Sequence, residues 1–204
     1  YEVRNNTPEL QLTVAPLHGK MPETYTCDLP GFYQIPNLLA TLETIYQLNR
    51  RVYLSSKSWD ISNEAVRKGL SNIRGLTGLR GRWEQLNSEP LVICDIAHNP
   101  DAIRWHRQQL SHYDYQNLHL VFGMTQEKEL EPILQSLPAE AIYHFCHPDL
   151  PRGRPGEELR KQAKGFDLEG TVSSSVSEAL DHAINHAAGT DDLILVTGSA
   201  FVVA

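Results

Sequence analysis

From residue 91 onward, short apolar runs alternate with amphipathic segments, and this alternation restricts the possible folds more than any other feature. The expected strands are 91–95, 118–123, 141–146 and 192–198, and the expected helices are 100–110, 129–137, 155–163 and 176–187. Strands that are apolar throughout and alternate with helices form a parallel sheet covered on both faces. The sequence therefore predicts a doubly wound, mostly parallel α/β domain, in which ligands bind beyond the carboxyl ends of the strands.

The first 75 residues show a different pattern. The expected elements are strands at 9–14 and 25–29 and helices at 31–50 and 62–74, with Ser62 as a helix N-cap. Gly75, Gly78 and Gly81 follow at even spacing without a core-sized apolar run, which favours an interdomain linker. We place this linker at 76–81, between a first domain at 1–75 and a second at 82–204.

Composition excludes several classes of function. Lys plus Arg is 18 and Asp plus Glu is 25, so the net charge is −7, and the absence of a basic tract argues against nucleic-acid binding. No apolar run approaches the roughly 18 residues that cross a bilayer, so no membrane partner is expected. Cys27, Cys94 and Cys146 are odd in number and widely spaced, which fits free thiols and predicts a cytoplasmic protein.

Polar residues follow four of the expected strands. These strand ends read DIAHNPD (95–101), FGMTQEK (122–128), CHPDLPRGR (146–154) and TGSAF (197–201). Because the carboxyl ends of parallel strands share one edge of the sheet, these segments are expected to gather there. The sequence predicts a functional site at this edge.

Asp95 is the strongest single candidate for a ligand-binding residue. A carboxylate directly after a buried strand suits ribose hydroxyls or a metal-bound water. The alternative is a helix N-cap, but Asn99, followed by Pro100 at the first helical position, suits that role better. His98 could contact a nucleotide or bond to backbone, and the residues alone leave both open.

Two further residues are weaker candidates for ligand binding, because each also has a common structural interpretation. Arg82 follows the glycine-rich segment and could bind phosphate through its guanidinium, although a solvated linker arginine is the commoner case. Asn37, near a helix start, would first be interpreted as a capping or surface residue.

Patterns typical of metal or phosphate sites are discounted. His182 and His186 stand one helical turn apart without a following Glu or a third ligand, so a surface pair is the prediction. His144, Cys146 and His147 are interpreted as packing and edge residues. No segment matches the P-loop pattern GxxxxGK[ST], and no metal ligand is predicted in the chain.

Five ordered motifs resemble the second half of the folylpolyglutamate synthase/dihydrofolate synthases, the folate branch of the Mur ligase family. They are LPGFYQIPNLLATLETI (29–45), GLRGRWEQL (78–86), LVICDIAHNPDAI (91–103), LVFGMTQEKEL (120–130) and ILVTGSAFVVA (194–204). The departures are Arg80 where proline is common, Trp83 where Phe is usual, and Gln126-Glu127 where an acid often precedes the lysine. None of them removes a functional side chain.

The resemblance implies a domain assignment. Residues 1–75 would be the last part of a P-loop ATPase-type central domain, and 82–204 the Rossmann-like C-terminal glutamate ligase domain. The chain begins at Tyr1 and ends within an apolar element, so we expect a fragment whose phosphate loop and magnesium ligands lie upstream.

The resemblance also implies roles for individual residues. Asn37 would contact the adenine side of ATP, Arg82 would reach its phosphates, and Asp95 would meet the nucleotide from the C-terminal domain. His98, in the same HNP loop, would assist.

The implied activity is an ATP-dependent ligation that proceeds through an acyl phosphate and requires Mg²⁺. L-Glutamate would be added to dihydropteroate or a reduced folate, and the missing N-terminal part of the same protein would be the partner. The fragment alone is expected to be inactive. The alternatives are a peptidoglycan-precursor Mur ligase and a non-catalytic nucleotide-binding fragment; GRWEQL followed by DIAHNPD favours the folate branch.

Overall fold

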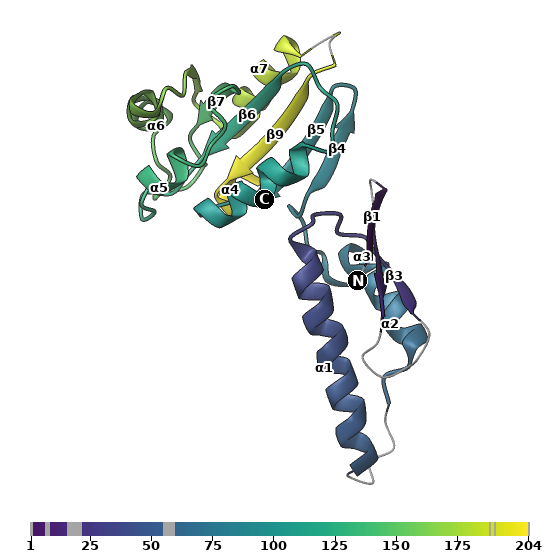
Figure 1. Cartoon of the computed structure of the whole chain (residues 1–204). Coiled ribbons are helices and arrows are strands. Elements are labelled where there is room, and N and C mark those ends of the chain that lie inside the picture. The colour runs from purple at the N-terminus through teal and green to yellow at the C-terminus, as the bar shows by residue number, and fades with distance from the viewer. Residues whose placement is uncertain are drawn as a thin grey trace. The chain divides into compact units, whose positions relative to one another are not determined.

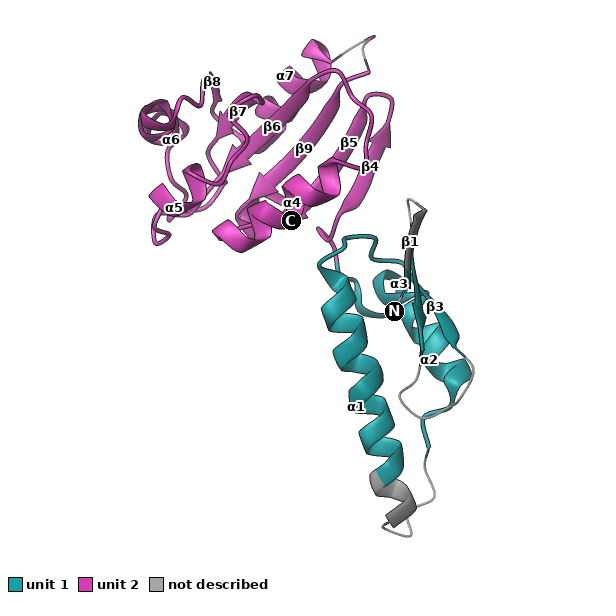
Figure 2. Ribbon diagram, in the orientation of Figure 1, with its two compact units in different colours: residues 1–79 teal, residues 80–204 magenta. Residues whose placement is uncertain are grey.

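The computed structural model describes residues 2–6, 9–15, 22–54, 60–187, 189 and 191–203. The chain divides into two compact units, Tyr1–Leu79 and Arg80–Ala204 (Figure 2). The division falls inside the segment predicted as a linker, while the assignment of the units to Mur ligase domains stays a prediction. Within the described ranges, no helix combines the length and apolarity needed to span a bilayer.

Unit 1 pairs a small antiparallel sheet with three helices. The elements are β1 (Glu2–Asn6), β2 (Glu9–Val14), β3 (Glu23–Cys27), α1 (Gln34–Leu54), α2 (Asn63–Leu70) and α3 (Ile73–Thr77). The sheet has the order β1-β2-β3. Strand β1 was not predicted, and β3 begins two residues before the predicted strand 25–29.

The predicted helix 62–74 is two helices. Ser62 caps α2 as expected, because its Oγ accepts the N–H of Ala65 at 3.2 Å. The Asp28 carboxylate accepts the N–H groups of Ile73 and Arg74 at 3.1 and 3.0 Å and thereby fixes the start of α3. Since α3 runs to Thr77, the first two residues of the predicted linker 76–81 are helical.

Unit 2 contains a six-stranded sheet with the order β4-β5-β9-β6-β7-β8 (Figure 1; β8 is labelled in Figure 2). Its strands are β4 (Glu84–Ser88), β5 (Leu91–Ile96), β6 (Leu118–Gly123), β7 (Ile142–Cys146), β8 (Gly170–Ser173) and β9 (Leu193–Gly198). Strands β5 to β9 pair in parallel, and only β4 is antiparallel to its neighbour. The predicted mostly parallel α/β fold is therefore confirmed.

Helices cover both faces of this sheet. They are α4 (Pro100–Leu110), α5 (Glu131–Leu134), α6 (Gly156–Ala163), the 3-10 turn η1 (Lys164–Phe166), α7 (Val176–His186) and α8 (Ala200–Val203). The apolar residues of α4, α5 and α6 join one buried cluster with Ile93 of β5, whereas α7 and α8 join a second cluster with Val92 and Cys94. Successive strand residues point to opposite faces, so Asp95 shares the face of Ile93, beneath α4.

The start of α4 agrees with the sequence. Asn99 Oδ1 accepts the N–H of Ala102 at 2.9 Å, and Pro100 occupies the first helical position. Asn99, not Asp95, is therefore the N-cap. The three cysteines, Cys27, Cys94 and Cys146, are free and buried.

Candidate functional site

The turn Gly81–Trp83 enters unit 2 with two residues in the left-handed backbone region. Gly81 has φ 65° and Trp83 has φ 50°. A side chain at Gly81 would overlap Val203 Cγ1, so glycine is required there for space as well as for conformation. At Trp83 the conformation costs on the order of 1–3 kcal/mol and persists only where surrounding contacts impose it.

Hydrogen bonds from three directions impose this conformation. The N–H of Trp83 donates to Asp95 Oδ2 at 2.5 Å, and the N–H of Ile96 donates to the Gly81 carbonyl at 3.2 Å. The N–H of Gly81 donates to Glu84 Oε2 at 2.9 Å. The turn is thus attached to the end of β5 and to the start of β4.

Asp95 is a buried residue with both carboxylate oxygens occupied. The residue is 1% exposed, and its Oδ1 lies 2.7 Å from Nε2 of His106, which is 3% exposed. A carboxylate only accepts hydrogen bonds, so His106 Nε2 carries the proton. The carboxylate therefore faces α4 and the turn, not solvent, and the predicted contact of Asp95 with a nucleotide stays a prediction.

His106 and Trp83 are site residues that the sequence reasoning missed. A signal for His106 was present, because Ile103, His106 and Leu110 recur at the spacing of one helical face, and all three are buried. A polar residue on a buried helix face needs a partner, and the strand that α4 covers ends in a carboxylate. No such signal marked Trp83.

Arg82 and His98 both lie on segments that adjoin the end of β5. Arg82 is half-buried, and its Nη1 donates to the Gly81 carbonyl at 3.1 Å. His98 is exposed on the loop after β5, and partial desolvation, followed by the positive charges of Lys128 and Arg82, lowers its pKa below the usual 6.5. These three residues, Arg82, His98 and Lys128, are called the cationic cluster below.

The loop that carries Lys128 is held by Arg154. Arg154 Nη2 donates to the carbonyls of Gln126 and Lys128 at 2.8 and 3.2 Å, and Nη1 pairs with Glu158 at the start of α6. The N–H of Gln126 donates to the Arg152 carbonyl at 2.9 Å. The loops after β6 and β7 therefore form one assembly, which fixes the backbone beneath Lys128.

The ends of three central strands converge beside this assembly. Gly198, with φ 119°, lies so close to Gly123 that a side chain would overlap the Gly123 carbonyl oxygen. That oxygen accepts the N–H of Ser199 at 2.9 Å, while the Gly198 carbonyl accepts the N–H of Ala97 at 3.1 Å. Strands β5, β6 and β9 thus end together, as expected for the carboxyl ends of parallel strands.

Asn37 belongs to unit 1. It lies in the first turn of α1, is exposed, and donates from Nδ2 to Gln34 Oε1 at 2.9 Å. Its predicted role on the adenine side of ATP stays a prediction.

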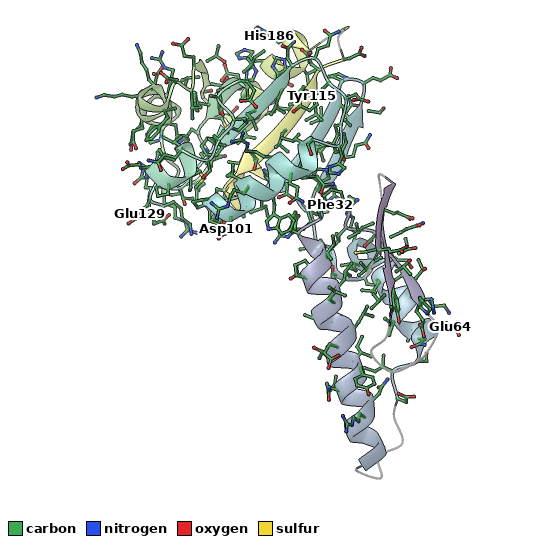
Figure 3. All side chains as sticks on the ribbon, in the orientation of Figure 1. Phe32, Glu64, Asp101, Tyr115, Glu129 and His186 are labelled. Carbon is green, nitrogen blue, oxygen red and sulfur yellow. The ribbon has the colours of Figure 1, made fainter. Side chains whose placement is uncertain are left out.

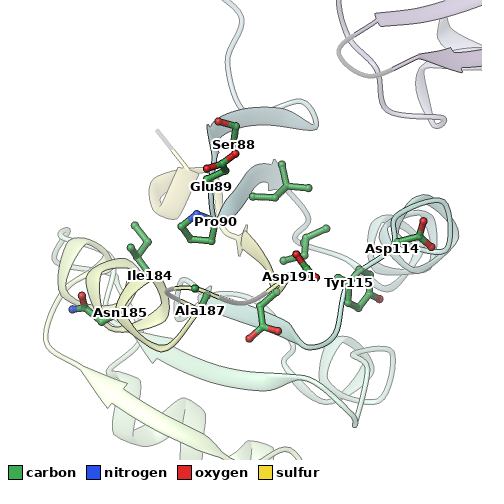
Figure 4. Close-up of a pocket in the computed structure, with 13 residues that line it drawn as sticks. Ser88, Glu89, Pro90, Asp114, Tyr115, Ile184, Asn185, Ala187 and Asp191 are labelled. Carbon is green, nitrogen blue, oxygen red and sulfur yellow. The ribbon is translucent and has the colours of Figure 1, made fainter.

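A cavity of about 720 Å³ lies at the opposite edge of the unit 2 sheet (Figure 4). Its lining includes Leu91 and Leu193, the first residues of β5 and β9, together with Tyr115. In Figure 3, Tyr115 lies at the end of unit 2 opposite Asp101. The cavity is therefore not part of the predicted site.

Buried histidines lie under α7. His119 Nδ1 is 3.0 Å from His144 Nε2, and His119 Nε2 is 3.1 Å from Asp192 Oδ2. Thr171 Oγ1 is 3.3 Å from His144 Nδ1. The exposed ring of His186 stands edge-on to both buried imidazoles. Across the residues that the structure describes, no three His, Cys, Asp or Glu side chains have the arrangement of a metal site.

The cationic cluster has the chemistry of an anion site. Guanidinium and ammonium groups donate to phosphate oxygens, and a phosphate would favour the protonated form of His98. Mg²⁺ prefers carboxylate and carbonyl oxygens, which the cluster itself does not supply. The cluster suits an anionic group, whereas ligands for Mg²⁺ would have to come from other residues.

A family model described as "Mur ligase, glutamate ligase domain" matches residues 81–200. The chain is 37% identical over 148 residues to a Haloferax volcanii protein named "Probable bifunctional folylpolyglutamate synthase/dihydropteroate synthase". That match covers 71% of this chain and 17% of the relative.

Two solved structures are similar to the chain. One is a bifunctional folylpolyglutamate synthase/dihydrofolate synthase from Yersinia pestis, complexed with AMPPNP and a Mn ion. The match has a TM-score of 0.60 and 27% identity, and it covers 71% of this chain and 33% of that one. The other is the Mycobacterium tuberculosis folylpolyglutamate synthase, complexed with ADP and AMPPCP. Here the TM-score is 0.74 and the identity 24%, with 100% of this chain and 45% of that one covered, which supports the fold alone. The chain thus spans less than half of either structure.

Proposed function

The chain belongs to the Mur ligase family through its glutamate ligase domain, and on this premise we propose that it is part of an ATP-dependent ligase of the folate branch. The reaction would add L-glutamate to dihydropteroate or to a reduced folate. Support for the folate branch comes from the similarity to the Haloferax volcanii and Yersinia pestis proteins.

The proposal is supported by the joint end of β5 and β6, because the turn around Arg82 is bound to the end of β5 and the loops after β5 and β6 carry His98 and Lys128. A carboxylate is a poor electrophile because it is anionic and resonance-stabilised, so phosphorylation by ATP supplies a leaving group. Negative charge develops on the transferred phosphoryl group, and fixed cations stabilise it. The amino group of glutamate would then attack the acyl phosphate and release phosphate.

Under the proposal, Asp95 has a structural role at this site and does not bind the nucleotide. Asp95 is 1% exposed and its carboxylate lies against Trp83 and His106, which donate to it at 2.5 and 2.7 Å, so burial keeps a nucleotide away from it in this arrangement. We therefore assign Asp95 to fixing the turn that carries Arg82. Asn37 of unit 1 is proposed to contact the adenine side.

The rest of the ATP site is proposed to lie outside these residues. The cationic cluster lacks oxygen ligands for Mg²⁺, and the chain has no P-loop sequence. The chain spans 17% and 33% of the relatives that suggest the activity. Under the proposal, the 204-residue chain shows no ligase activity alone and acts together with a phosphate loop and magnesium ligands elsewhere in the enzyme.

The test is an assay of the complete enzyme with ATP and L-glutamate, in which dihydropteroate and tetrahydrofolate are offered separately. Glutamate-dependent ADP release with either acceptor supports the proposal. Arg82→Ala should lower kcat/KM for ATP by about 100-fold. Lys161→Ala, which removes an exposed cation from α6, is the matched control and should leave it unchanged. Turnover with a UDP-muramoyl peptide and no folate acceptor would refute the folate branch.

A further inference from the structure

Asp95 and His106 form a buried pair directly beneath the turn that carries Arg82. His106 lies in the middle of α4, and its Nε2–H donates to Asp95 Oδ1 at 2.7 Å. The second oxygen of the same carboxylate accepts the N–H of Trp83. One imidazole therefore sets the orientation of the carboxylate that holds the Arg82–Trp83 peptide.

The Trp83 side chain makes a second connection to α4. Its ring stands edge-on to the His106 ring, with centroids 5.3 Å apart and an interplanar angle of 61°. Its indole Nε1–H donates to the Tyr113 hydroxyl, just beyond α4, at 2.9 Å. The side chain of the residue after Arg82 is thus held by α4 and the segment that follows it, while its backbone N–H is held by Asp95 of β5, the partner of His106.

This arrangement has a conformational consequence for Arg82. Trp83 adopts φ 50°, which a side-chain-bearing residue leaves when nothing restrains it. Relaxation to a negative φ rotates the Arg82–Trp83 peptide about the N–Cα bond of Trp83. Arg82 precedes that peptide and moves with it, because the Trp83 side chain is fixed in the core.

We infer that His106 is a positioning residue for Arg82, acting through the Asp95 carboxylate on the left-handed turn at Trp83. This inference rests on the proposed function of Arg82 as an ATP-phosphate ligand. His106 touches no substrate itself. Its role is to keep the guanidinium where the phosphates bind, since displacement of a binding group by about 1 Å can cost 100-fold in rate.

The first test compares two substitutions in the complete enzyme. His106→Gln keeps an N–H donor near the position of Nε2, whereas His106→Leu fills the space without a donor. We expect His106→Leu to lower kcat/KM for ATP by about 10- to 100-fold and His106→Gln to restore most of the loss. If His106→Leu does not fold, His106→Asn, whose amide is too short to reach Asp95, takes its place.

The second test is a double-mutant cycle with Arg82→Ala. If His106 acts through Arg82, His106→Leu should change the kinetics of the Arg82→Ala enzyme by no more than about twofold, because the group that it positions is gone. A general structural defect would instead reduce activity by the same factor in both backgrounds, and that result would overturn the inference.

The third test is independent of catalysis and uses the 204-residue chain. Exchange of the Trp83 amide proton, followed by NMR, should be slow in the wild type and in His106→Gln, and faster in His106→Leu, relative to core amides of β6. If the complete enzyme shows no ligase activity but the Trp83 amide responds, the proposed function fails while the turn-holding role stands. An amide that is indifferent to His106 refutes that role whatever the enzyme does.

Discussion

The N–H of Trp83 donates to Asp95 Oδ2 at 2.5 Å, and so a residue with left-handed backbone is bound to the end of a buried strand. The sequence predicts that this carboxylate binds a ligand. In the structure it belongs to the framework that shapes the site. A framework role and a ligand role differ in what they predict for stability.

Asp95→Ala should lower the free energy of unfolding by about 2–4 kcal/mol, because it leaves the buried N–H of Trp83 and Nε2–H of His106 without their acceptor. Urea unfolding of the 204-residue chain measures this. Asp101→Ala is the control: its exposed carboxylate pairs with the exposed Arg104, and its loss should cost less than about 1 kcal/mol. Equal stability of Asp95→Ala and the wild type would contradict the framework role.

Gly81→Ala should destabilise the chain more than Gly78→Ala. Both glycines have left-handed backbones, with φ 65° and 68°, so each alanine costs about 1–2 kcal/mol from conformation. Only at Gly81 does the new methyl group overlap a neighbour, Val203, whereas the space around Gly78 is open. The difference between the two unfolding free energies isolates the overlap, and equal losses would show that Val203 gives way freely.

Lys128→Met should raise the pKa of His98. Partial desolvation is the largest cause of the lowered pKa, and the charges of Lys128 and Arg82 add to it, so removal of one charge should restore the pKa only partly. An NMR titration of the His98 ring protons measures this shift. Lys161→Met, a change on the exposed surface of α6, should leave the titration in place. No shift with Lys128→Met would place that ammonium group outside the cationic cluster.

Acid should destabilise the chain through His144. Burial first, and then the neighbouring imidazoles of His119, His186 and His182, lower the pKa of His144 from 6.5 to about 4. The native state therefore binds fewer protons than the unfolded state between these two values. The contribution of neutral His144 to the free energy of unfolding is complete above pH 6.5 and is lost as the pH falls toward 4. The loss amounts to up to about 3 kcal/mol.

Urea unfolding at a series of pH values in that interval tests this prediction. His144→Gln cannot titrate but can still donate to His119, so its stability should depend less on pH than that of the wild type. His112→Gln, at an exposed histidine after α4, should show the wild-type dependence. If His144→Gln and the wild type lose stability in parallel, another group is responsible.

The strands that lie in the centre of the sheet were predictable from the sequence. β6 and α4 match the expected ranges 118–123 and 100–110, because a fully buried strand is apolar throughout and the α4 start has both an N-cap and a proline. β4 was missed because four of its five residues are exposed and carry no periodic signal. The predicted helix 129–137 is reduced to α5, Glu131–Leu134.

The candidate site was predictable in its location more than in its geometry. The rule that strand ends share an edge indicated the loops that carry His98 and Lys128, whereas Arg82 was indicated by its place after the glycine-rich segment; the positive charges of Lys128 and Arg82 contribute to the lowered pKa of His98. The direction of Asp95 could be inferred from alternation with Ile93, but its partners could not. Trp83 and His106 are separated from it by 12 and 11 positions, and only tertiary packing brings three such residues together.

The hydrogen bonds of the buried imidazoles under α7 all donate in the same direction, toward Asp192. A carboxylate has no proton to give, so His119 must point its Nε2–H at Asp192 and offers His144 only a lone pair. His144 must then carry its proton on Nε2 and accept from the hydroxyl of Thr171. One carboxylate oxygen of Asp192, just before β9, thus determines which nitrogen carries the proton in a ring two strands away.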